Sequence, residues 1–303
     1  MTKTLLVDFD SKIPNLALMK LSAYEKSIGN TTGFDIENPD KIYCSVVFSK
    51  NRDQARGIVT MFPGKDIIFG GSGWDLNNHL PEHIETMKPD YDLYPSSYSQ
   101  GFTTRGCIRK CPFCVVPEKE GPLATAQHPS QFHDDRFRKS MWMDNNLLAA
   151  PRGWVRDVFA WAHDSGVTAD LTQGVDARLM TEEYAGLMKD ACKDVRMAWD
   201  NMSDEKKIFR AIDLLEDAGF DLKHHISFYV LSGFNTTFDE DLYRCNKLRD
   251  RGVNAFVMLY HRKDKQKNRL ARWANRRWSY WSGPFNANDN TGSGHICDYR
   301  DKT

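Results

Sequence analysis

The stretch Gly106-Cys107-Ile108-Arg109-Lys110-Cys111-Pro112-Phe113-Cys114 carries three cysteines in the spacing C-x3-C-x2-C. A short loop with this spacing can turn all three thiols toward one point. Thiolates are soft ligands that suit zinc or iron–sulfur clusters. A cluster of four irons held by only three cysteines leaves one iron without a protein ligand, and that iron can bind a small molecule. We therefore predict a reactive metal site in this loop.

Two other interpretations of the same spacing remain open. A tetrahedral zinc site needs a fourth ligand, and His128 and His133 follow within reach along the chain. Alternatively, the three thiols are unrelated core residues, because free cysteine often behaves as a small buried hydrophobe.

Composition excludes several classes of protein. The chain has 41 Lys and Arg against 41 Asp and Glu, so no global field directs it to nucleic acid or to a membrane. No apolar run is long enough to span a bilayer, and the N-terminus, residues 1–8, is too short and too soon acidic for a signal peptide. The 7 cysteines are an odd number with three clustered, which argues against a disulfide framework. We expect a cytoplasmic protein with no membrane partner.

The first part of the chain, residues 1–95, reads as a small Rossmann-like α/β domain. Short apolar runs predict strands at Leu5–Val7, Ile42–Phe48 and Asp66–Gly70, with a helix opening at Pro14 and another over 51–61. The loop Gly70–Gly73 could cradle a phosphate, although a plain tight turn is the more ordinary interpretation. The proline-rich stretch 81–95 is predicted to be the linker between domains.

From residue 96 to residue 283 the pattern becomes strand then helix, repeated six times. Such regular alternation predicts parallel strands with right-handed crossovers, and hence a barrel or part of one. The last segment, 284–303, is predicted to be a loose tail. The expected strands are Gly101–Arg105, Ser140–Asp144, Thr168–Thr172, Val195–Trp199, Ile226–Leu231 and Asn254–Leu259.

The cysteine loop and the six units after it resemble the radical S-adenosylmethionine (radical SAM) superfamily. Its mark is C-x3-C-x-aromatic-C, and Phe113 fills the aromatic position. The resemblance implies a partial (β/α)6 barrel in which Cys107, Cys111 and Cys114 hold a [4Fe-4S] cluster whose fourth iron chelates SAM. It implies reductive cleavage of SAM to methionine and a 5′-deoxyadenosyl radical that abstracts hydrogen from an unidentified substrate. It also implies an electron donor such as flavodoxin or ferredoxin.

Functional residues of β/α barrels follow the carboxyl ends of the strands. By resemblance, the residues expected to contact SAM are Phe113, Asp144, Asn145, Asn146, Arg178, Asp200, Gly233 and Met258. Asp144, Asn145 and Asn146 stand where the family often has Gly-Gly-Glu for the amino group of SAM; a turn or capping role is an equal alternative. No general base is predicted, because positioning and exclusion of water matter more for a carbon radical.

The remaining candidates have distinct expected roles. Arg178 can clamp a carboxylate bidentately, or form an ion pair with Asp176. Asp200 can bind ribose hydroxyls. Gly233 permits a close approach to adenine because it has no Cβ, and Met258 can line the adenine pocket.

The N-terminal region resembles the cobalamin-binding-type domain found in one large branch of the same superfamily, most closely over 10–20. The cobalt-ligand motif D-x-H-x-x-G of that domain is missing, because Lys12 stands where the histidine would follow Asp10. The sequence therefore argues against cobalamin, and cobalamin-dependent methyl transfer is kept only as an alternative function.

The segment 262–281 is basic and contains Trp273, Trp278 and Trp281. The ordinary interpretation is an amphipathic helix packed on the barrel with its charges in solvent. The other interpretation is a surface for RNA, since basic and aromatic residues serve phosphate binding and base stacking. A zinc- or cluster-stabilised nucleic-acid-binding module is therefore the alternative function of a different class.

Overall fold

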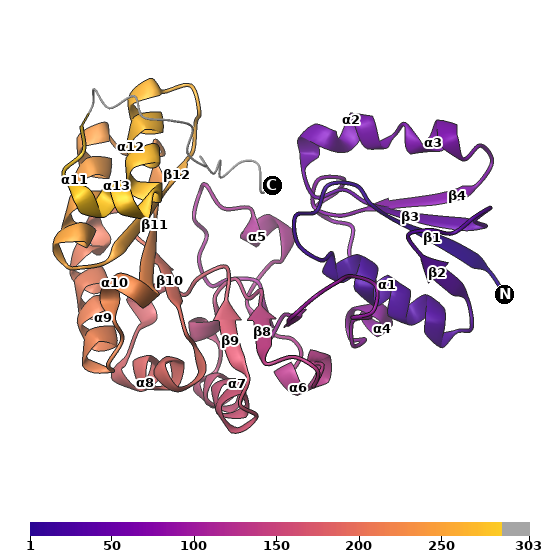
Figure 1. Cartoon of the computed structure of the whole chain (residues 1–303), viewed down its shortest axis with the longest axis horizontal. Coiled ribbons are helices and arrows are strands. Elements are labelled where there is room, and N and C mark those ends of the chain that lie inside the picture. Colours follow the sequence, from indigo (N-terminus) through magenta and orange to yellow (C-terminus); the bar gives the residue numbers. More distant parts are fainter. Residues whose placement is uncertain (287–303) are drawn as a thin grey trace. The chain divides into compact units, whose positions relative to one another are not determined.

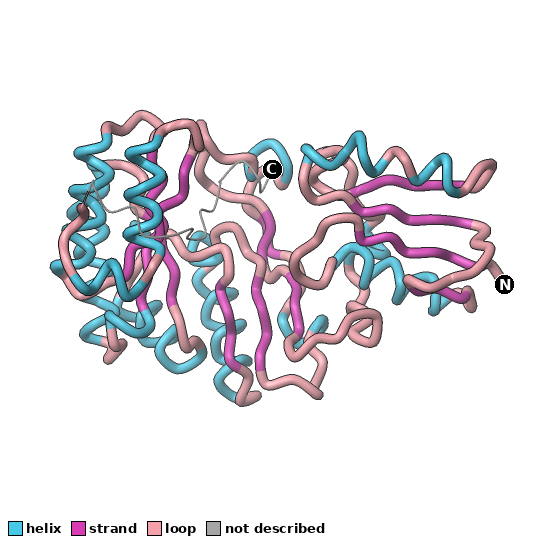
Figure 2. The backbone as a smooth tube through the Cα atoms, turned by 45° about the horizontal axis from the view of Figure 1, so that its top comes forward, coloured by secondary structure: helices cyan, strands magenta, loops and turns pink. Residues whose placement is uncertain are grey.

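The computed structural model describes residues 1–286 of the 303-residue chain (Figure 1). The predicted tail over 284–303 thus lies almost wholly outside the described residues. The described part is a mixed α/β protein with parallel strands, as the sequence predicts (Figure 2). The described residues form two compact units, one made of 1–101 and 127–140 and the other of 102–126 and 141–286.

The first unit is built on a four-stranded sheet in the order β2-β1-β3-β4, in which each pair of neighbouring strands is parallel. Its strands are β1 (Lys3–Asp8), β2 (Thr31–Gly33), β3 (Lys41–Ser45) and β4 (Asp66–Gly70). Helices cover both faces of this sheet (Figure 1). They are α1 (Leu16–Ser27) and α4 (Glu82–Glu85) on one face, and α2 (Arg52–Ala55) and α3 (Ile58–Met61) on the other.

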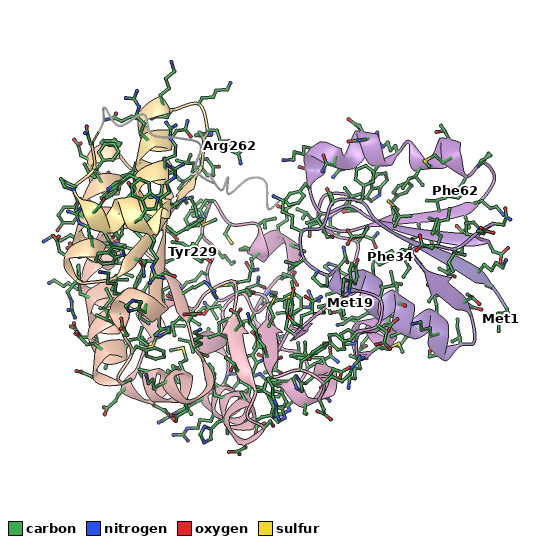
Figure 3. The ribbon with its side chains drawn as sticks, in the orientation of Figure 1. Met1, Met19, Phe34, Phe62, Tyr229 and Arg262 are labelled. Carbon is green, nitrogen blue, oxygen red and sulfur yellow. The ribbon has the colours of Figure 1, made fainter. Side chains whose placement is uncertain are left out.

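Two apolar clusters, one on each face, form the core of this unit. Leu6 and Tyr43 pack against Leu18 of α1 and Ile84 of α4. On the opposite face, Cys44 packs with residues of α2 and α3. Successive residues of a strand point to opposite faces, so neighbours such as Tyr43 and Cys44 serve different clusters. Met19 of α1 is also fully buried (Figure 3).

Three predictions for this unit are wrong in detail. Helix α1 begins after Asn15 rather than at Pro14, because the Asn15 side chain caps it by accepting from Leu18 N at 3.2 Å. The helix predicted over 51–61 is broken at Gly57 into α2 and α3. The predicted linker 81–95 belongs to the core of the unit, since Ile84 and Tyr91 are each 5% exposed.

Three short elements of the first unit follow its sheet in sequence. They are the 3-10 turn η1 (Ser49–Asn51), strand β5 (Ser99–Gly101) and helix α6 (Pro129–Phe132). Gly101 packs on Phe132, where an added Cβ would lie 2.6 Å from the ring. The Tyr91 hydroxyl donates to Phe132 O at 2.7 Å, which ties the segment 127–140 to this unit.

The second unit contains the parallel strands β10 (Val195–Ala198), β11 (Ile226–Ser232) and β12 (Asn254–Leu259). Strand β8 (Lys139–Trp142) neighbours β9 (Thr168–Leu171), and two isolated parallel bridges, Ala169 to Cys192 and Val175 to Met197, follow the line of the strands. Long helices lie between the strands in sequence. They are α7 (Arg152–Asp164), α8 (Glu182–Ala191), α9 (Glu205–Asp217), α11 (Phe238–Asp250) and α12 (Lys265–Asn275).

The shorter elements of the second unit connect these strands and helices. They are β6 (Thr104–Arg105), α5 (Val116–Lys119), β7 (Ala124–Thr125), η2 (Leu147–Ala149), η3 (Ala177–Leu179), η4 (Met202–Asp204), α10 (Leu222–His225) and α13 (Arg277–Ser282). Over residues 1–286, no helix has both the length and the apolar content needed to cross a bilayer.

Most of the predicted strands of the second unit are confirmed, with one correction. Thr181 caps α8, accepting from Tyr184 N at 3.1 Å. Asp204 occupies the N-cap position of α9 without a side-chain hydrogen bond to the helix. The strand predicted over 101–105 is split into β5 and β6, and β6 pairs antiparallel with β7. The split occurs where Thr103 and Thr104 turn their backbone N–H groups to Asp144.

A buried ion pair joins α11 to the carboxyl ends of two strands. The Asp241 and Arg244 side chains are both 0% exposed, and Arg244 donates to Asp241 at 2.5 Å. Arg244 also donates to Trp199 O at 2.5 Å and to Leu231 O at 2.9 Å. Because these carbonyls follow β10 and end β11, one guanidinium fixes the ends of both strands.

We predict that Arg244→Ala destabilises the protein by about 3–5 kcal/mol, because it leaves the Asp241 carboxylate buried without its partner. Thermal unfolding followed by circular dichroism should show a large fall in melting temperature. The matched control is Arg210→Ala, which removes an exposed arginine from α9 and should change stability by less than about 0.5 kcal/mol. Equal melting temperatures for the two variants would contradict this role of Arg244.

Candidate functional site

The cysteine loop leaves β6 at Gly106 and returns to β7 after Gly121. Gly106 has a positive φ of 76°, and a Cβ built on it would lie 2.3 Å from Pro122 O. The backbone of the outgoing arm therefore touches that of the returning arm, which only glycine permits. Cys107 N donates to Gly121 O at 3.4 Å, and Arg105 pairs with Glu120 at 2.8 Å. These contacts close the base of the loop.

Inside the loop, one sulfur already accepts two N–H groups. The backbone N–H of Arg109 donates to Cys107 Sγ at 3.3 Å, and the side-chain amide of Asn146 donates to the same sulfur at 3.4 Å. Cys114 N donates to Cys111 O at 3.0 Å, so the second half of the motif is a tight turn. Hydrogen bonds to sulfur are one of the means by which proteins adjust the potential of iron–sulfur clusters.

The three thiols share one electrostatic neighbourhood. All three are half-buried. Burial raises the pKa of the Cys111 thiol, the positive charge of Arg178 opposes that rise, and Cys114, Asp200 and Cys107 add to it. Arg178 and Asp200 were both predicted as site residues, so the structure brings them into the surroundings of the cysteine loop.

The loop fits a thiolate-held group in ligand type and in its N–H donors, but the sulfurs are not converged on one point. Over residues 1–286, no three His, Cys, Asp or Glu side chains are arranged to hold a metal ion. The histidines considered for zinc have other roles in the first unit. His128 caps α6, accepting from Ser130 N at 3.4 Å, and His133 is buried.

Asp144 holds the chain that leads into the loop. Its carboxylate is fully buried and accepts from Thr103 N at 3.2 Å, Thr103 Oγ1 at 2.7 Å, Thr104 Oγ1 at 2.5 Å and the backbone N–H of Thr104. Burial raises its pKa, and the four hydrogen bonds oppose that rise. The structure gives Asp144 a positioning role, while its predicted contact with SAM stays a prediction.

The two asparagines after Asp144 each present a buried carbonyl oxygen. Asn146 uses its amide N–H on Cys107 Sγ. Within the described residues, Oδ1 of Asn145 and Oδ1 of Asn146 have no hydrogen-bond partner. A buried unpaired acceptor is unfavourable by about 1–3 kcal/mol, so such atoms call for an explanation. A ligand that donates N–H groups beside the cysteine loop would supply one.

Arg178 is engaged in the ion pair that was its alternative role. It donates to both oxygens of Asp176, at 2.6 and 3.1 Å, and pairs with Asp204 at 3.4 Å. Arg109 of the cysteine loop also binds Asp176, at 3.0 Å. Asp176 therefore connects the loop to the segment after β9, a link that the sequence analysis missed because the two are far apart in the chain.

Phe113 belongs to a row of aromatic rings. Its ring centroid lies 5.2 Å from that of Phe234, which lies 4.9 Å from Tyr260, which lies 4.7 Å from His261. These rings come from the loop and from the segments after β11 and β12. Gly233, predicted to approach adenine, has a φ of 89°, and a Cβ built on it would lie 3.2 Å from the ammonium of Lys267. Met258 is 7% exposed near the end of β12.

The loops of the first unit do not fit cobalamin. The Asp10 carboxylate already accepts hydrogen bonds from Val47 N at 2.6 Å, Phe48 N at 3.0 Å and the Asn51 side-chain amide at 2.9 Å. The Lys12 ammonium lies 5.5 Å from the Phe48 ring centroid. No histidine stands at the expected position.

The glycine loop after β4 has a structural explanation. A Cβ on Gly71 would lie 2.4 Å from Val46 O, and one on Gly73 would lie 2.5 Å from the backbone of Phe48. Both glycines are therefore required by close packing on the segment after β3, without any need for a bound phosphate.

The comparisons with known proteins add no family. No protein-family model matches the chain, and no curated protein is significantly similar to it.

We predict that Gly106→Ala disrupts the cysteine loop and Gly121→Ala does not. Both glycines have positive φ, 76° and 72°, so both variants carry a strain of about 1–2 kcal/mol. Only Gly106 has backbone within reach of the new methyl group; nothing lies within 4 Å at Gly121. Gly106→Ala should lower the melting temperature further and make the loop thiols react faster with a thiol reagent. Similar reactivity in both variants would refute the backbone contact.

We also predict that Asp200→Asn stabilises the protein at neutral pH. Burial raises the pKa of Asp200 to about 6 from its usual 3.8. A raised carboxyl pKa means that stability is greatest at low pH and falls as the pH rises from about 4 to about 6. The variant should therefore gain roughly 1–3 kcal/mol above pH ~6 and nothing near pH ~4. Melting temperatures measured across this range test it, and a gain that is independent of pH would contradict it.

Proposed function

We propose that the chain is a radical SAM enzyme, with Cys107, Cys111 and Cys114 as ligands of a [4Fe-4S] cluster. The observation that carries the proposal is the cysteine loop itself. Its base is closed by Gly106, its first sulfur accepts two N–H groups, and its turn brings Cys111 and Cys114 into mutual electrostatic influence. These contacts favour a loop that binds a soft metal group over three unrelated core thiols, and the three sulfurs would converge when that group binds.

The arrangement of the strands supports the same proposal. Polar residues follow the carboxyl ends of β8, β9, β10 and β11, and those near the loop include Asn146, Arg178 and Asp200. Such an edge is the usual location of active sites in β/α proteins. We infer that the second unit corresponds to a partial (β/α)6 barrel, and the first unit to a Rossmann-like domain.

When bound, the cluster would supply one electron to the sulfonium of SAM, which breaks the bond from sulfur to the 5′ carbon and yields methionine and a 5′-deoxyadenosyl radical. The residues of the chain would position SAM for this step. The buried carbonyls of Asn145 and Asn146 would accept from its ammonium group. Arg178 would attract its carboxylate, shared with Asp176.

The aromatic row would protect the radical. Phe113 and Phe234 present ring faces and edges without acid–base groups, so they can exclude water without reacting as proton donors. The hydrogen atom would then be taken from a substrate held against these rings. Flavodoxin or ferredoxin is the class of electron donor that we propose, and a reducing cytoplasm would suit the three thiols.

The test is anaerobic reconstitution of the full chain with iron and sulfide, followed by reduction with dithionite in the presence of SAM. We expect a coloured protein, a cluster signal in electron paramagnetic resonance, and release of 5′-deoxyadenosine. Cys111→Ala should lose both cluster and product. The matched control is Cys192→Ala, which removes a buried thiol outside the loop and should retain both.

A second variant tests the hydrogen bond to sulfur. Asn146→Ala should keep the cluster but lower the rate of 5′-deoxyadenosine release by about 10- to 100-fold, in line with the effect of removing a partner of a metal ligand. A fully loaded cluster that releases no 5′-deoxyadenosine in the unmodified protein would count against the proposed function. A colourless protein with one bound zinc would do the same.

A further inference from the structure

The end of the described chain carries a basic hollow that the proposed function does not use. It lies on α12 and α13, which pack on each other (Figures 1 and 2). The empty space is ≈ 540 Å³, including solvent at its mouth. The lining residues are Arg269, Arg272, Trp273, Arg276, Trp278, Ser279, Ser282, Gly283, Pro284 and Asn286. We call these residues the basic hollow.

The hollow follows from the way α12 is packed. Leu270, Ala271, Trp273 and Ala274 are buried, and α12 packs on β12. Arg269, Arg272 and Arg276 are spaced by three and four positions, so the helix places them along one side. Arg276 has extended backbone angles and separates α12 from α13, so the helical path turns at that residue. The guanidinium groups thus line a concave surface between the two helices.

The charge of this region departs sharply from that of the chain. The whole sequence is balanced at 41 basic and 41 acidic residues. Residues 262–286 contain eight Lys or Arg and one acidic residue, Asp264, and they begin with the exposed Arg262 (Figure 3). Among the described residues that line the basic hollow, none is acidic. A local excess of this kind attracts anions even when the net charge of the protein is zero.

An exposed indole accompanies the arginines. Trp278 is 65% exposed, whereas Trp273, which lines the same hollow, is 7% exposed. Trp273 is held by a hydrogen bond to Gly283 O at 3.2 Å and by Arg249, whose guanidinium carbon lies 5.5 Å from its ring centroid. Trp273 is therefore part of the core. Trp278 keeps most of its surface in solvent, in a hollow that three arginines also line. Packing into the core therefore does not explain the presence of an indole at this position.

We propose that the basic hollow is a binding site for single-stranded nucleic acid. Arg269, Arg272 and Arg276 contact successive backbone phosphates, and one unpaired base stacks on Trp278. Guanidinium groups bind phosphate oxygens with two parallel hydrogen bonds, and every base has a face that can stack on an indole. A duplex offers phosphates but no free base face, so the exposed indole favours a single strand over a duplex. The proposal does not depend on the radical SAM function.

The experiment measures binding of fluorescein-labelled 12-nucleotide single strands, one of RNA and one of DNA, to the full chain by fluorescence anisotropy at several salt concentrations. The variants are Arg272→Gln, Trp278→Ala and Trp278→Phe, and the control is Arg210→Gln, which removes an exposed arginine from α9. Circular dichroism verifies that each variant is folded. A duplex of the same length and heparin serve as competitors.

We expect binding that weakens with salt, as contacts to about three phosphates require. Trp278→Ala should weaken binding roughly tenfold, and Trp278→Phe should retain most of it because a phenyl ring still stacks. Arg272→Gln should weaken binding about fivefold and reduce the slope of log affinity against log salt by about 0.7. Arg210→Gln should bind like the unmodified chain. RNA and DNA that bind equally would support recognition of the shared backbone and base chemistry, and tighter binding of one would identify the natural form.

Three results would overturn the proposal. The first is no binding of either single strand at low salt, and the second is equal binding by Arg272→Gln and Arg210→Gln. The third is that heparin or duplex competes as strongly as the unlabelled single strand while Trp278→Ala has no effect. The last result would mean a general attraction of polyanions without a stacked base.

Discussion

The buried carboxylate of Asp144 is the constraint on which the cysteine loop depends. A carboxylate removed from water is unfavourable unless several donors surround it, and Thr103 and Thr104 supply four. Two of these donors are backbone N–H groups that would otherwise belong to a strand. The backbone must therefore leave its extended path at Thr103 and Thr104, and these hydrogen bonds to Asp144 fix the position at which the cysteine loop begins. An apolar residue in place of Asp144 would leave those N–H groups without acceptors.

The same constraint orders the far side of the site. Asn146 lies two residues after Asp144 and reaches Cys107 Sγ, while Arg109 of the loop reaches Asp176 after β9. Each contact joins the loop to the end of a different strand. The loop is thus anchored at its base by glycine and threonine, and along its length by an amide and an ion pair. The sulfur of Cys107 is held by a neighbour that is distant in the chain.

Local pattern was enough to predict the alternation of strands and helices, and it found Cys111, Arg178 and Asp200 as members of one neighbourhood. It did not find the roles of Thr103, Thr104 and Arg109, because each depends on a partner at least forty positions away, which periodicity does not encode. It also misread 81–95 as a linker, since prolines mark irregular backbone whether or not it is buried. The two adjacent threonines shortly before Gly106, with Arg105 between, were the available signal.

The ion pair between Asp241 and Arg244 has a consequence for motion. Since Arg244 holds carbonyls that follow β10 and end β11, helix α11 cannot detach without exposing a charged pair and freeing both strand ends. These elements should exchange their amide hydrogens with solvent as one cooperative unit, and only through rare opening. Asp200, which accepts from Leu231 N at 3.2 Å, belongs to the same unit and should become exposed to solvent only when α11 opens.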